Sequence, residues 1–355
     1  IQRLRGQMQH FNMDAILITN KPNRYYLSGF TGSSALLYIT MEKAQLITDF
    51  RYIEQANSQC QEYEIIDQET DGLIAAAMKL AKKDHIKSIG FESEHISYST
   101  YLELKEYQEY EFLPAKSLVE KLRQIKDEAE LSKMRQAAKI ADDAFSSIVL
   151  FIKENYQKGL TERDVALKLE ALMKENGASK TSFESIVASG AKSSLPHAEP
   201  DQNTLKHGDF VVMDFGCVFQ GYCSDMTRTV VIGEPADKHR EIYQIVLKAQ
   251  MEALSYIRSG LEGKAVDKVA RDIITEAGYG KFFGHGLGHS VGIEIHENPR
   301  FSPKEPNVIE EGMVLTVEPG IYIPGFGGVR IEDMVIIKDN GIENLTHSPK
   351  ELIVI

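Results

Sequence analysis

Short apolar runs alternate with helical stretches along the first third of the chain. The runs with the length and composition of buried strands are 15–19, 35–39, 45–48, 64–66 and 88–92. A helix is predicted over residues 72–83, because Leu73, Ala76, Ala77 and Leu80 share one helical face. Strands that alternate with helices are typical of doubly wound sheets. We therefore expect residues 1–122 to form an α/β N-terminal domain.

A different pattern begins at Asp127, which has the spacing of a capping box with Glu130 and predicts the start of a long helix. The apolar stripe of this helix is Leu131, Met134, Ala138, Ala141, Phe145, Ile148 and Ile152. Further helices are predicted over 161–176, 238–258 and 264–277, the last of them ending before Gly278. We place the second domain at residues 127–355.

The first of two predicted hairpins in this domain carries two aspartates. Its strands are 210–215 and 224–231. A turn centred between residues 219 and 220 places Asp214 opposite Asp225. Like charges in directly opposed positions destabilise a sheet unless something compensates them, and a divalent cation is a natural compensation.

The second predicted hairpin carries two glutamates in the same way. Its strands are 314–318 and 328–332. A turn centred on Gly325 places Glu318 opposite Glu332. Two acidic hairpins, each pairing its carboxylates, would suit a site with internal pseudo-symmetry.

A glycine-rich segment, GHGLGH at 284–289, lies between the hairpins and ends at His289. Hard and borderline divalent cations are bound by carboxylate oxygens and imidazole nitrogens. Taken singly, each acid is better explained as a turn residue or a solvated surface group than as a metal ligand. Together the two aspartates, the two glutamates and the histidine predict a site for two metal ions, and a metallohydrolase.

Composition narrows the class of protein. The 355 residues suffice for two or three domains, and the formal net charge of −12 argues against nonspecific binding to nucleic acid or an anionic membrane. No apolar run approaches the roughly 20 residues that span a bilayer. The three cysteines suit a reducing compartment and core packing rather than a disulfide framework. We expect a cytoplasmic protein.

The signatures MDFG (213–216), SDMTR (224–228), GHGLGH, VEPG (317–320) and RIED (330–333), in this order, resemble the pita-bread (M24) metallopeptidases. The segment SLPHAEP at 194–200 resembles the proline-specific branch, the Xaa-Pro dipeptidases (prolidases) and aminopeptidases P. Residues 1–122 resemble the N-terminal domain of that branch. The resemblance implies an α+β pita-bread catalytic domain with pseudo-two-fold halves, and a homodimer.

The resemblance also implies how the metal ions are held. Asp214 would chelate one ion, Asp225 and Glu332 would bridge both, and His289 and Glu318 would complete the other site. Manganese or cobalt is usual in such enzymes, and zinc and iron also suit these ligands. The chemistry implied is attack by a metal-activated hydroxide, with Glu318 as general base.

Three histidines match family residues that line the substrate site. His296 is expected to donate to the developing oxyanion, His285 to border the proline pocket, and His197 to contact substrate from across the cleft. Arg300, in HENPR (296–300), and Arg330 are candidate anchors for a substrate carboxylate, because a guanidinium matches a carboxylate in shape and charge. Arg330 is equally explained as support for a neighbouring metal ligand.

A carboxylate anchor favours a dipeptidase that cleaves the Xaa-Pro bond of dipeptides with a C-terminal proline. An aminopeptidase P, which releases the N-terminal residue of longer Xaa-Pro peptides, remains open. Two readings from other classes are a non-catalytic peptide-binding or protein-binding member of the same fold and a metal-free amidinohydrolase like creatinase. The complete set of ligands counts against both.

Overall fold

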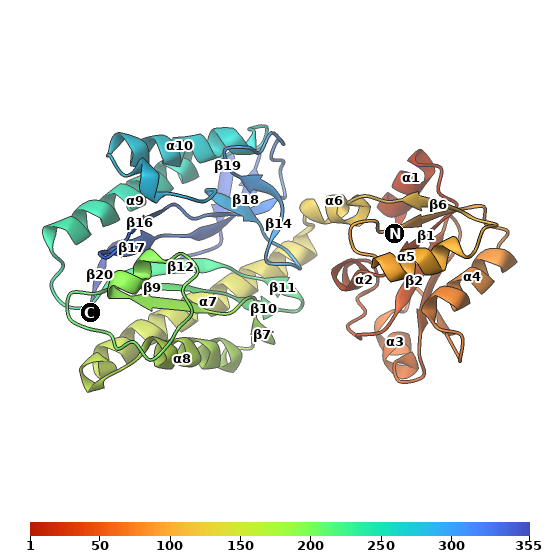
Figure 1. The fold of residues 1–355 in the computed structure, drawn as a ribbon, viewed down its shortest axis with the longest axis horizontal. Helices are drawn as coiled ribbons and strands as arrows, with labels where there is room; N and C mark the ends of the chain where they lie inside the picture. The colour runs from red at the N-terminus through yellow and green to blue at the C-terminus, as the bar shows by residue number, and fades with distance from the viewer. The chain divides into compact units, whose positions relative to one another are not determined.

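The computed structural model describes residues 1–355 (Figure 1). They divide into two compact units, Ile1–Arg123 and Gln124–Ile355. The domain boundaries that we predict from the sequence, 1–122 and 127–355, stay a prediction.

The first unit is built on one six-stranded sheet with the order β4-β3-β2-β1-β5-β6. Its strands are β1 (Ala15–Ile18), β2 (Leu36–Thr40), β3 (Ala44–Thr48), β4 (Glu64–Asp67), β5 (Ser88–Phe91) and β6 (Glu111–Pro114). Its helices are α1 (Gln2–His10), α2 (Lys21–Ser28), α3 (Ile53–Gln59), α4 (Leu73–Lys83), α5 (Tyr98–Lys105) and α6 (Leu118–Gln124). Strand β1 pairs antiparallel with β2 and parallel with β5.

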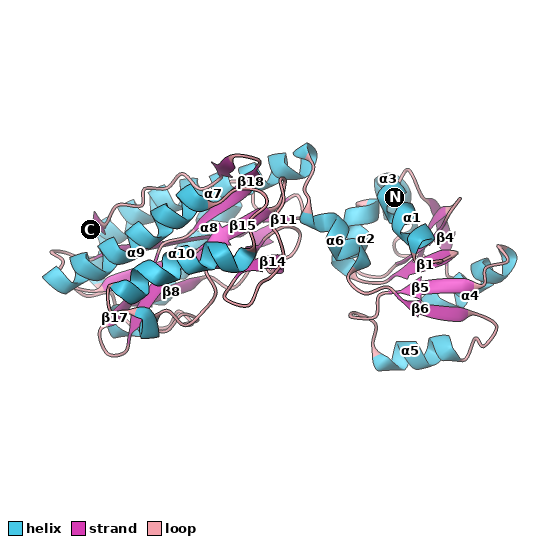
Figure 2. Ribbon diagram, turned by 90° about the horizontal axis from the view of Figure 1, so that it is seen from above, coloured by secondary structure: helices cyan, strands magenta, loops and turns pink.

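The central strand β1 is buried on both faces, because alternate side chains enter two different cores. Ile16 and Ile18 pack in the core on one face, and Ala15 and Leu17 pack in the core on the other. Figure 2 shows the strands of this unit between helices. The predicted α/β organisation of the N-terminal domain is confirmed.

The second unit contains two similar halves. The first half comprises α7 (Glu128–Asn155), α8 (Glu162–Glu175), β7 (Lys180–Thr181), β8 (Ile186–Ser189), β9 (Phe210–Phe215), β10 (Cys217–Phe219), β11 (Tyr222–Cys223) and β12 (Met226–Val231). The second half comprises α9 (Asp237–Tyr256), α10 (Gly263–Glu276), β13 (Gly288–Ser290), β14 (Glu297–Phe301), β15 (Val314–Val317), β16 (Gly320–Ile323), β17 (Gly327–Arg330), β18 (Asp333–Lys338), β19 (Gly341–Asn344) and β20 (Ile353–Val354). Short 3₁₀ helices are η1 (Tyr156–Lys158), η2 (Gly190–Ser194) and η3 (Gly280–Phe282).

The two halves repeat one order of elements. In each, two helices precede three antiparallel strands that neighbour one another, β8-β9-β12 in the first half and β13-β15-β18 in the second. A short hairpin, β10-β11 in the first half and β16-β17 in the second, lies in the chain between the second and third of these strands. Helices α7 and α8 lie on one side of the sheets, and α9 and α10 lie on the other (Figure 1). This arrangement agrees with the expected pita-bread fold.

The long helix α7 begins as predicted. The Asp127 side chain accepts a hydrogen bond from the Glu130 backbone N–H, and the Glu130 carboxylate accepts one from the Asp127 N–H, both at 2.9 Å. The whole predicted apolar stripe is buried. Helices α8, α9 and α10 lie within two residues of the predicted bounds. No helix of the protein combines the length and apolar character needed to cross a membrane.

The three cysteines, Cys60, Cys217 and Cys223, are all buried and unpaired. Burial raises the pKa of each thiol, to about 11 for Cys217 and about 12 for Cys223. The prediction that Cys217 and Cys223 fill the core is therefore confirmed.

The first acidic hairpin differs from its predicted register. Its turn lies at Gln220 and Gly221, which both have positive φ, so the turn is centred one residue later than predicted. Asp214 therefore lies opposite Thr227, and the prediction that it lies opposite Asp225 was wrong. The partner has moved by two residues, which keeps both aspartates on one face of the sheet. Diagonal neighbours of this kind are about 7–8 Å apart.

The second acidic hairpin keeps its predicted register. The strand pairs on both sides of Glu318 and Glu332 follow a turn centred on Gly325. Between these pairs the ladder is interrupted, because the Glu318 N–H donates to the Leu287 carbonyl (2.8 Å) and the Glu332 N–H donates to the Thr227 carbonyl (3.1 Å). Each glutamate is thus tied through its backbone to a different strand or loop, which brings both into the middle of the unit.

Candidate functional site

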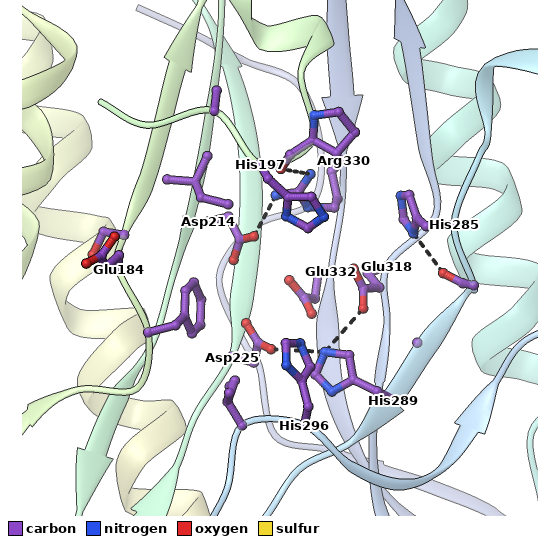
Figure 3. A pocket seen from close by; sticks show the side chains of 18 of the residues that line it. Glu184, His197, Asp214, Asp225, His285, His289, His296, Glu318, Arg330 and Glu332 are labelled. Carbon is purple, nitrogen blue, oxygen red and sulfur yellow. Dashed lines mark hydrogen bonds and ion pairs between the residues drawn. The ribbon is translucent and has the colours of Figure 1, made fainter. Parts of the chain in front are cut away.

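All the residues singled out in the sequence line one pocket of about 960 Å³ (Figure 3). They are His197, Asp214, Asp225, His285, His289, His296, Arg300, Glu318, Arg330 and Glu332. The pocket receives side chains from both halves of the second unit. Residues that the sequence interpretation did not include, such as Phe183, Glu184, Ile186 and Glu199, form part of the same lining.

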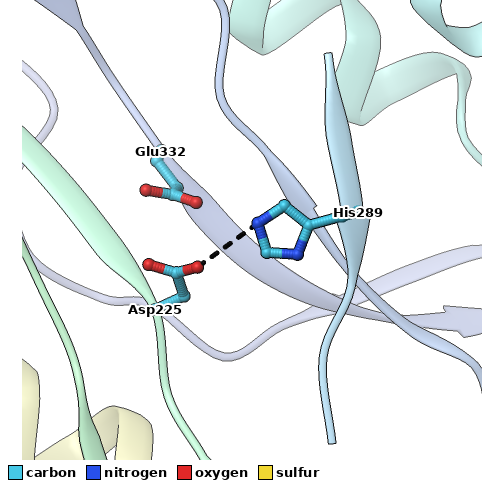
Figure 4. Close-up of side chains that lie close together, drawn as sticks. All are labelled: Asp225, His289 and Glu332. Carbon is cyan, nitrogen blue, oxygen red and sulfur yellow. Dashed lines mark ion pairs between the residues drawn. The ribbon is translucent and has the colours of Figure 1, made fainter. Parts of the chain in front are cut away.

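A carboxylate–imidazole cluster lies at the centre of the pocket. Single ligand atoms of Asp225, His289 and Glu332 all lie within 4.8 Å of one another (Figure 4). The His289 Nε2 atom is 3.5 Å from Asp225 Oδ2 and 3.4 Å from Glu318 Oε1. Asp225 precedes β12, His289 lies in β13, and the glutamates follow β15 and β17. Four of the five predicted metal ligands therefore meet.

The fifth predicted ligand, Asp214 of β9, lies beside this cluster and turns toward Arg330. Its Oδ2 atom accepts a hydrogen bond from Arg330 Nη2 at 2.5 Å. Its Oδ1 atom is buried and has no hydrogen-bond partner. A buried carboxylate oxygen without a donor is costly, so this atom is suited to a cation.

The fold holds the carboxylates of the cluster close together although their negative charges repel one another. Burial raises the pKa of Asp225 and Glu332, and the charges of neighbouring carboxylates raise both further. Burial also raises the pKa of Glu318 to about 8, against the opposing effect of the Arg330 charge. Such a group of acids favours either protons or metal cations near neutral pH.

His289 is in the protonation state that a metal ligand needs. Burial lowers its pKa to about 3, and the neighbouring His296 adds to this effect. Its Nδ1 atom lies 3.1 Å from the Ser290 carbonyl oxygen. Because a carbonyl can only accept, Nδ1 carries the proton and the Nε2 lone pair faces the carboxylates. Oxygen donors around a neutral imidazole fit borderline divalent cations such as manganese, iron, cobalt or zinc.

His285 is the first member of a hydrogen-bonded chain along one wall. Its Nδ1 donates to the Gly286 carbonyl at 2.8 Å, so Nε2 accepts from the Tyr322 hydroxyl at 2.9 Å. The Tyr322 oxygen in turn accepts from Arg330 Nη1 at 2.8 Å. Burial lowers the pKa of His285 to about 4. Both ring nitrogens are thus engaged, and His285 presents its ring to the pocket as a wall.

The two arginines differ in whether their guanidinium groups are free to bind a substrate carboxylate. Arg330 is 3% exposed, and it donates to Asp214, Tyr322 and the Thr227 hydroxyl. Arg300 is exposed, and its guanidinium forms no ion pair. Of the two predicted carboxylate anchors, only Arg300 has free donors, and Arg330 is placed to support metal ligands.

His296 and His197 lie exposed in the pocket lining. The His296 ring is 4.4 Å from that of His289, between centroids, in an edge-to-face arrangement. Burial lowers the pKa of His296, and the Arg300 charge lowers it further. The His197 side chain forms no hydrogen bond within the chain, so its ring nitrogens are available to a ligand.

Two threonines that the sequence interpretation missed orient the glutamates. The Thr227 hydroxyl donates to Glu332 Oε2 at 2.7 Å, and the Thr316 hydroxyl donates to Glu318 Oε1 at 3.1 Å. Alternate residues of a strand share a face. Thr227 lies two residues from Asp225, and Thr316 lies two residues from Glu318. The alternation of side chains along a strand would therefore have identified both threonines.

Two family models together match nearly the whole chain. Residues 1–125 match the creatinase/prolidase N-terminal domain, and residues 132–339 match metallopeptidase family M24. The chain is 45% identical to an uncharacterized peptidase, YqhT, from Bacillus subtilis, over 100% of this chain and 99% of the relative.

Solved structures agree with these models. An Xaa-Pro dipeptidase from Bacillus anthracis matches with a TM-score of 0.95 and 47% identity, over 100% of this chain and 98% of that one. An X-Pro aminopeptidase from Thermotoga maritima matches with a TM-score of 0.92 and 38% identity, over 98% of this chain and 100% of that one. The protein described here therefore belongs to metallopeptidase family M24, with a creatinase/prolidase N-terminal domain and a pita-bread catalytic domain.

Proposed function

We propose that the protein is an Xaa-Pro dipeptidase that uses two divalent metal ions to cleave the peptide bond before a C-terminal proline. The observation that carries the proposal is the convergence of Asp225, His289, Glu318 and Glu332, beside the partnerless oxygen of Asp214, in one pocket. The similarity to an Xaa-Pro dipeptidase over the whole chain supports it.

The metal ligands are assigned in the same way as from the sequence. Asp214 would hold one ion, Asp225 and Glu332 would be shared, and His289 with Glu318 would hold the other. When bound, divalent ions such as Mn²⁺ supply Lewis acidity that polarises the scissile carbonyl and acidifies a water molecule. The partnerless Asp214 oxygen and the neutral His289 fit this assignment.

Glu318 is proposed as the general base. Its carboxylate lies 3.4 Å from the Nε2 atom of His289, beside the proposed metal centre, where it can take a proton from the attacking water. The Thr316 hydroxyl fixes one of its oxygens. The proton taken from the attacking water would pass to the nitrogen of the leaving proline. That nitrogen belongs to a tertiary amide and has no N–H of its own.

The exposed histidines are proposed to act on the substrate. His296, next to His289, would donate an N–H to the oxyanion that develops in the transition state. One such donor is worth roughly 2.7–4 kcal/mol in other hydrolases. His197 would contact substrate from the other wall, while the hydrogen bonds of His285 restrict it to shaping the proline pocket.

The preference for dipeptides is proposed to come from Arg300, whose free guanidinium would bind the proline carboxylate. Replacing Arg300 with glutamine is expected to raise KM for Leu-Pro by about 10–100-fold, the effect of one or two charge-assisted hydrogen bonds. It should have little effect on KM for Leu-Pro amide, which lacks the carboxylate. The exposed Arg258 offers a matched control, since Arg258→Gln should leave both values unchanged.

The test of the proposed function is hydrolysis by the manganese-loaded protein of Ala-Pro and Leu-Pro against Ala-Pro-Ala. Cleavage of the dipeptides alone is the expected result. Equal cleavage of the tripeptide would instead identify an aminopeptidase P, the second candidate, which the similarity to an X-Pro aminopeptidase favours. Failure to cleave either peptide with metal bound would indicate a binding protein. Creatine turnover in chelator would indicate a creatinase-like enzyme.

A homodimer is also proposed, on the resemblance alone. The chain has a mass of 39.9 kDa. Light scattering at micromolar concentration should give twice this mass, and a value near that of one chain would contradict the proposal.

A further inference from the structure

The pocket lining includes two acids that the proposed mechanism does not use. Glu184 lies next to Phe183 before β8, and Glu199 lies in the loop that carries His197; all four residues line the pocket. In Figure 3, Glu184 and His285 lie on opposite sides of the central carboxylates. Glu184 therefore lies away from His285, which is proposed to border the proline pocket.

These two acids are free to bind a ligand. Glu184 and Glu199 are exposed, and the side chain of neither forms an ion pair or a hydrogen bond. The other four carboxylates that line the pocket are those assigned to the metal ions. The one lining guanidinium without an ion pair is that of Arg300. Beyond the metal centre, the lining thus offers two carboxylates and one guanidinium without an ion pair.

Apolar residues next to the acids in the sequence also line the pocket. They are Phe183, Ile186 and Pro200. A lysine or arginine side chain has an apolar stem and a charged end, and it commonly buries the stem while the charge stays near solvent. Apolar lining residues with exposed carboxylates beside them in the chain complement such a side chain.

The expected orientation of the substrate brings that side chain toward Glu184. If Arg300 binds the proline carboxylate, the residue before proline lies on the other side of the scissile bond, and Glu184 lies across the central carboxylates from His285 (Figure 3). The α-ammonium group is common to all Xaa-Pro dipeptides and gives no preference among them. A charge on the side chain of the first residue is what Glu184 and Glu199 can distinguish.

We propose that Glu184 and Glu199 select lysine or arginine as the residue before proline. This inference rests on the proposed dipeptidase function and names the substrates that it favours. Glu184 and Glu199 would act as specificity-determining residues, through attraction to the cationic end of the substrate side chain.

The test compares Lys-Pro with norleucine-Pro, which has the same number of side-chain carbons and no charge. The full-length, manganese-loaded protein is expected to favour Lys-Pro in kcat/KM by about 3–10-fold at low salt. Exposed ion pairs typically change an equilibrium by up to about fivefold each. Glu184→Gln should lower the Lys-Pro to norleucine-Pro ratio by about 2–5-fold, mainly through KM. The double variant with Glu199→Gln should bring the ratio near one.

Two further measurements separate selection from a structural role. The preference should weaken as salt screens the exposed charges. Glu184→Lys should reverse it, so that Glu-Pro is favoured over Lys-Pro, whereas a loss of structure would slow all substrates alike. Glu175→Gln, at an exposed glutamate without an ion pair at the end of α8, should leave the ratio unchanged.

The outcomes distinguish the two proposals. A wild-type ratio of one, or a ratio that the double variant does not change, overturns the selection by Glu184 and Glu199 while the dipeptidase function stands. If the wild-type protein hydrolyses neither norleucine-Pro nor Lys-Pro, the dipeptidase function is overturned and this inference with it.

Discussion

Replacing Asp225 with asparagine is expected to lower kcat/KM for Leu-Pro by about three orders of magnitude while the chain stays folded. Lewis-acid catalysis is worth several kcal/mol, and each 1.36 kcal/mol or so is a factor of ten in rate. Asparagine keeps the size of the side chain and removes the charge that would hold the ions. The measurement is steady-state hydrolysis together with bound metal determined by elemental analysis.

Thermal unfolding separates this result from misfolding. In the metal-free protein, burial raises the pKa of Asp225, Glu318 and Glu332. Their ionised forms therefore destabilise the folded state at neutral pH, and added Mn²⁺ should raise the melting temperature of the wild-type protein. This gain should shrink as the pH falls and the carboxylates take up protons instead. Asp225→Asn should lose most of the gain without melting lower in chelator.

The exposed Asp339, in the turn between β18 and β19, provides the matched control. Asp339→Asn removes one acid from the surface and should change neither activity nor metal content. Normal turnover by Asp225→Asn would remove Asp225 from the site and the metal-dependent mechanism with it.

Replacing Asp333 with alanine is expected to destabilise the second unit by about 3–5 kcal/mol, the usual effect of leaving a buried charge without its partner. The Asp333 carboxylate is fully buried and accepts hydrogen bonds from Arg228 (2.8 Å), Lys350 (2.7 Å) and Asn344 (2.7 Å). The melting temperature in chelator should fall by about 10 °C for a domain of this size. Asp272→Ala, which breaks an exposed pair with Lys268, should cost under about 1 kcal/mol.

The pH dependence of this effect has a definite sign. Burial alone would raise the pKa of Asp333, but the charges of Arg228 and Lys350 lower it below the ordinary value of 3.8. Its contribution to stability is therefore fully present above that value and is lost as the pH falls through the lower, folded-state pKa. The difference between wild type and Asp333→Ala should be constant near neutral pH and should narrow only in acid. A difference that already narrows above pH 6 would contradict this assignment.

The helices and strands were predictable because each has a clear local signal. The capping box at Asp127 and the apolar stripe of α7 specify a helix without reference to the rest of the chain. The candidate ligands were predictable because each lies in a short signature next to glycine, proline or a strand end. That these acids meet in one site was implied by the resemblance to the pita-bread metallopeptidases, which the order of the signatures carries.

Features that depend on a single backbone conformation were not predictable in this way. The first hairpin turns at Gln220 and Gly221, because Gln220 adopts a positive φ that glutamine rarely adopts. A turn centred one residue later moved the partner of Asp214 from Asp225 to Thr227. The chain from His285 through Tyr322 to Arg330 joins residues from three segments, and no local pattern in the sequence reports it.

The repeated order of elements in the second unit has a consequence for how the metal centre comes into being. Asp214 and Asp225 belong to the first repeat, whereas His289, Glu318 and Glu332 belong to the second. A fragment cut between β12 and α9 would therefore retain only part of the ligand set, whichever side it keeps. Tight metal binding then requires that the two repeats have packed against each other, and the bound ions would link the two repeats.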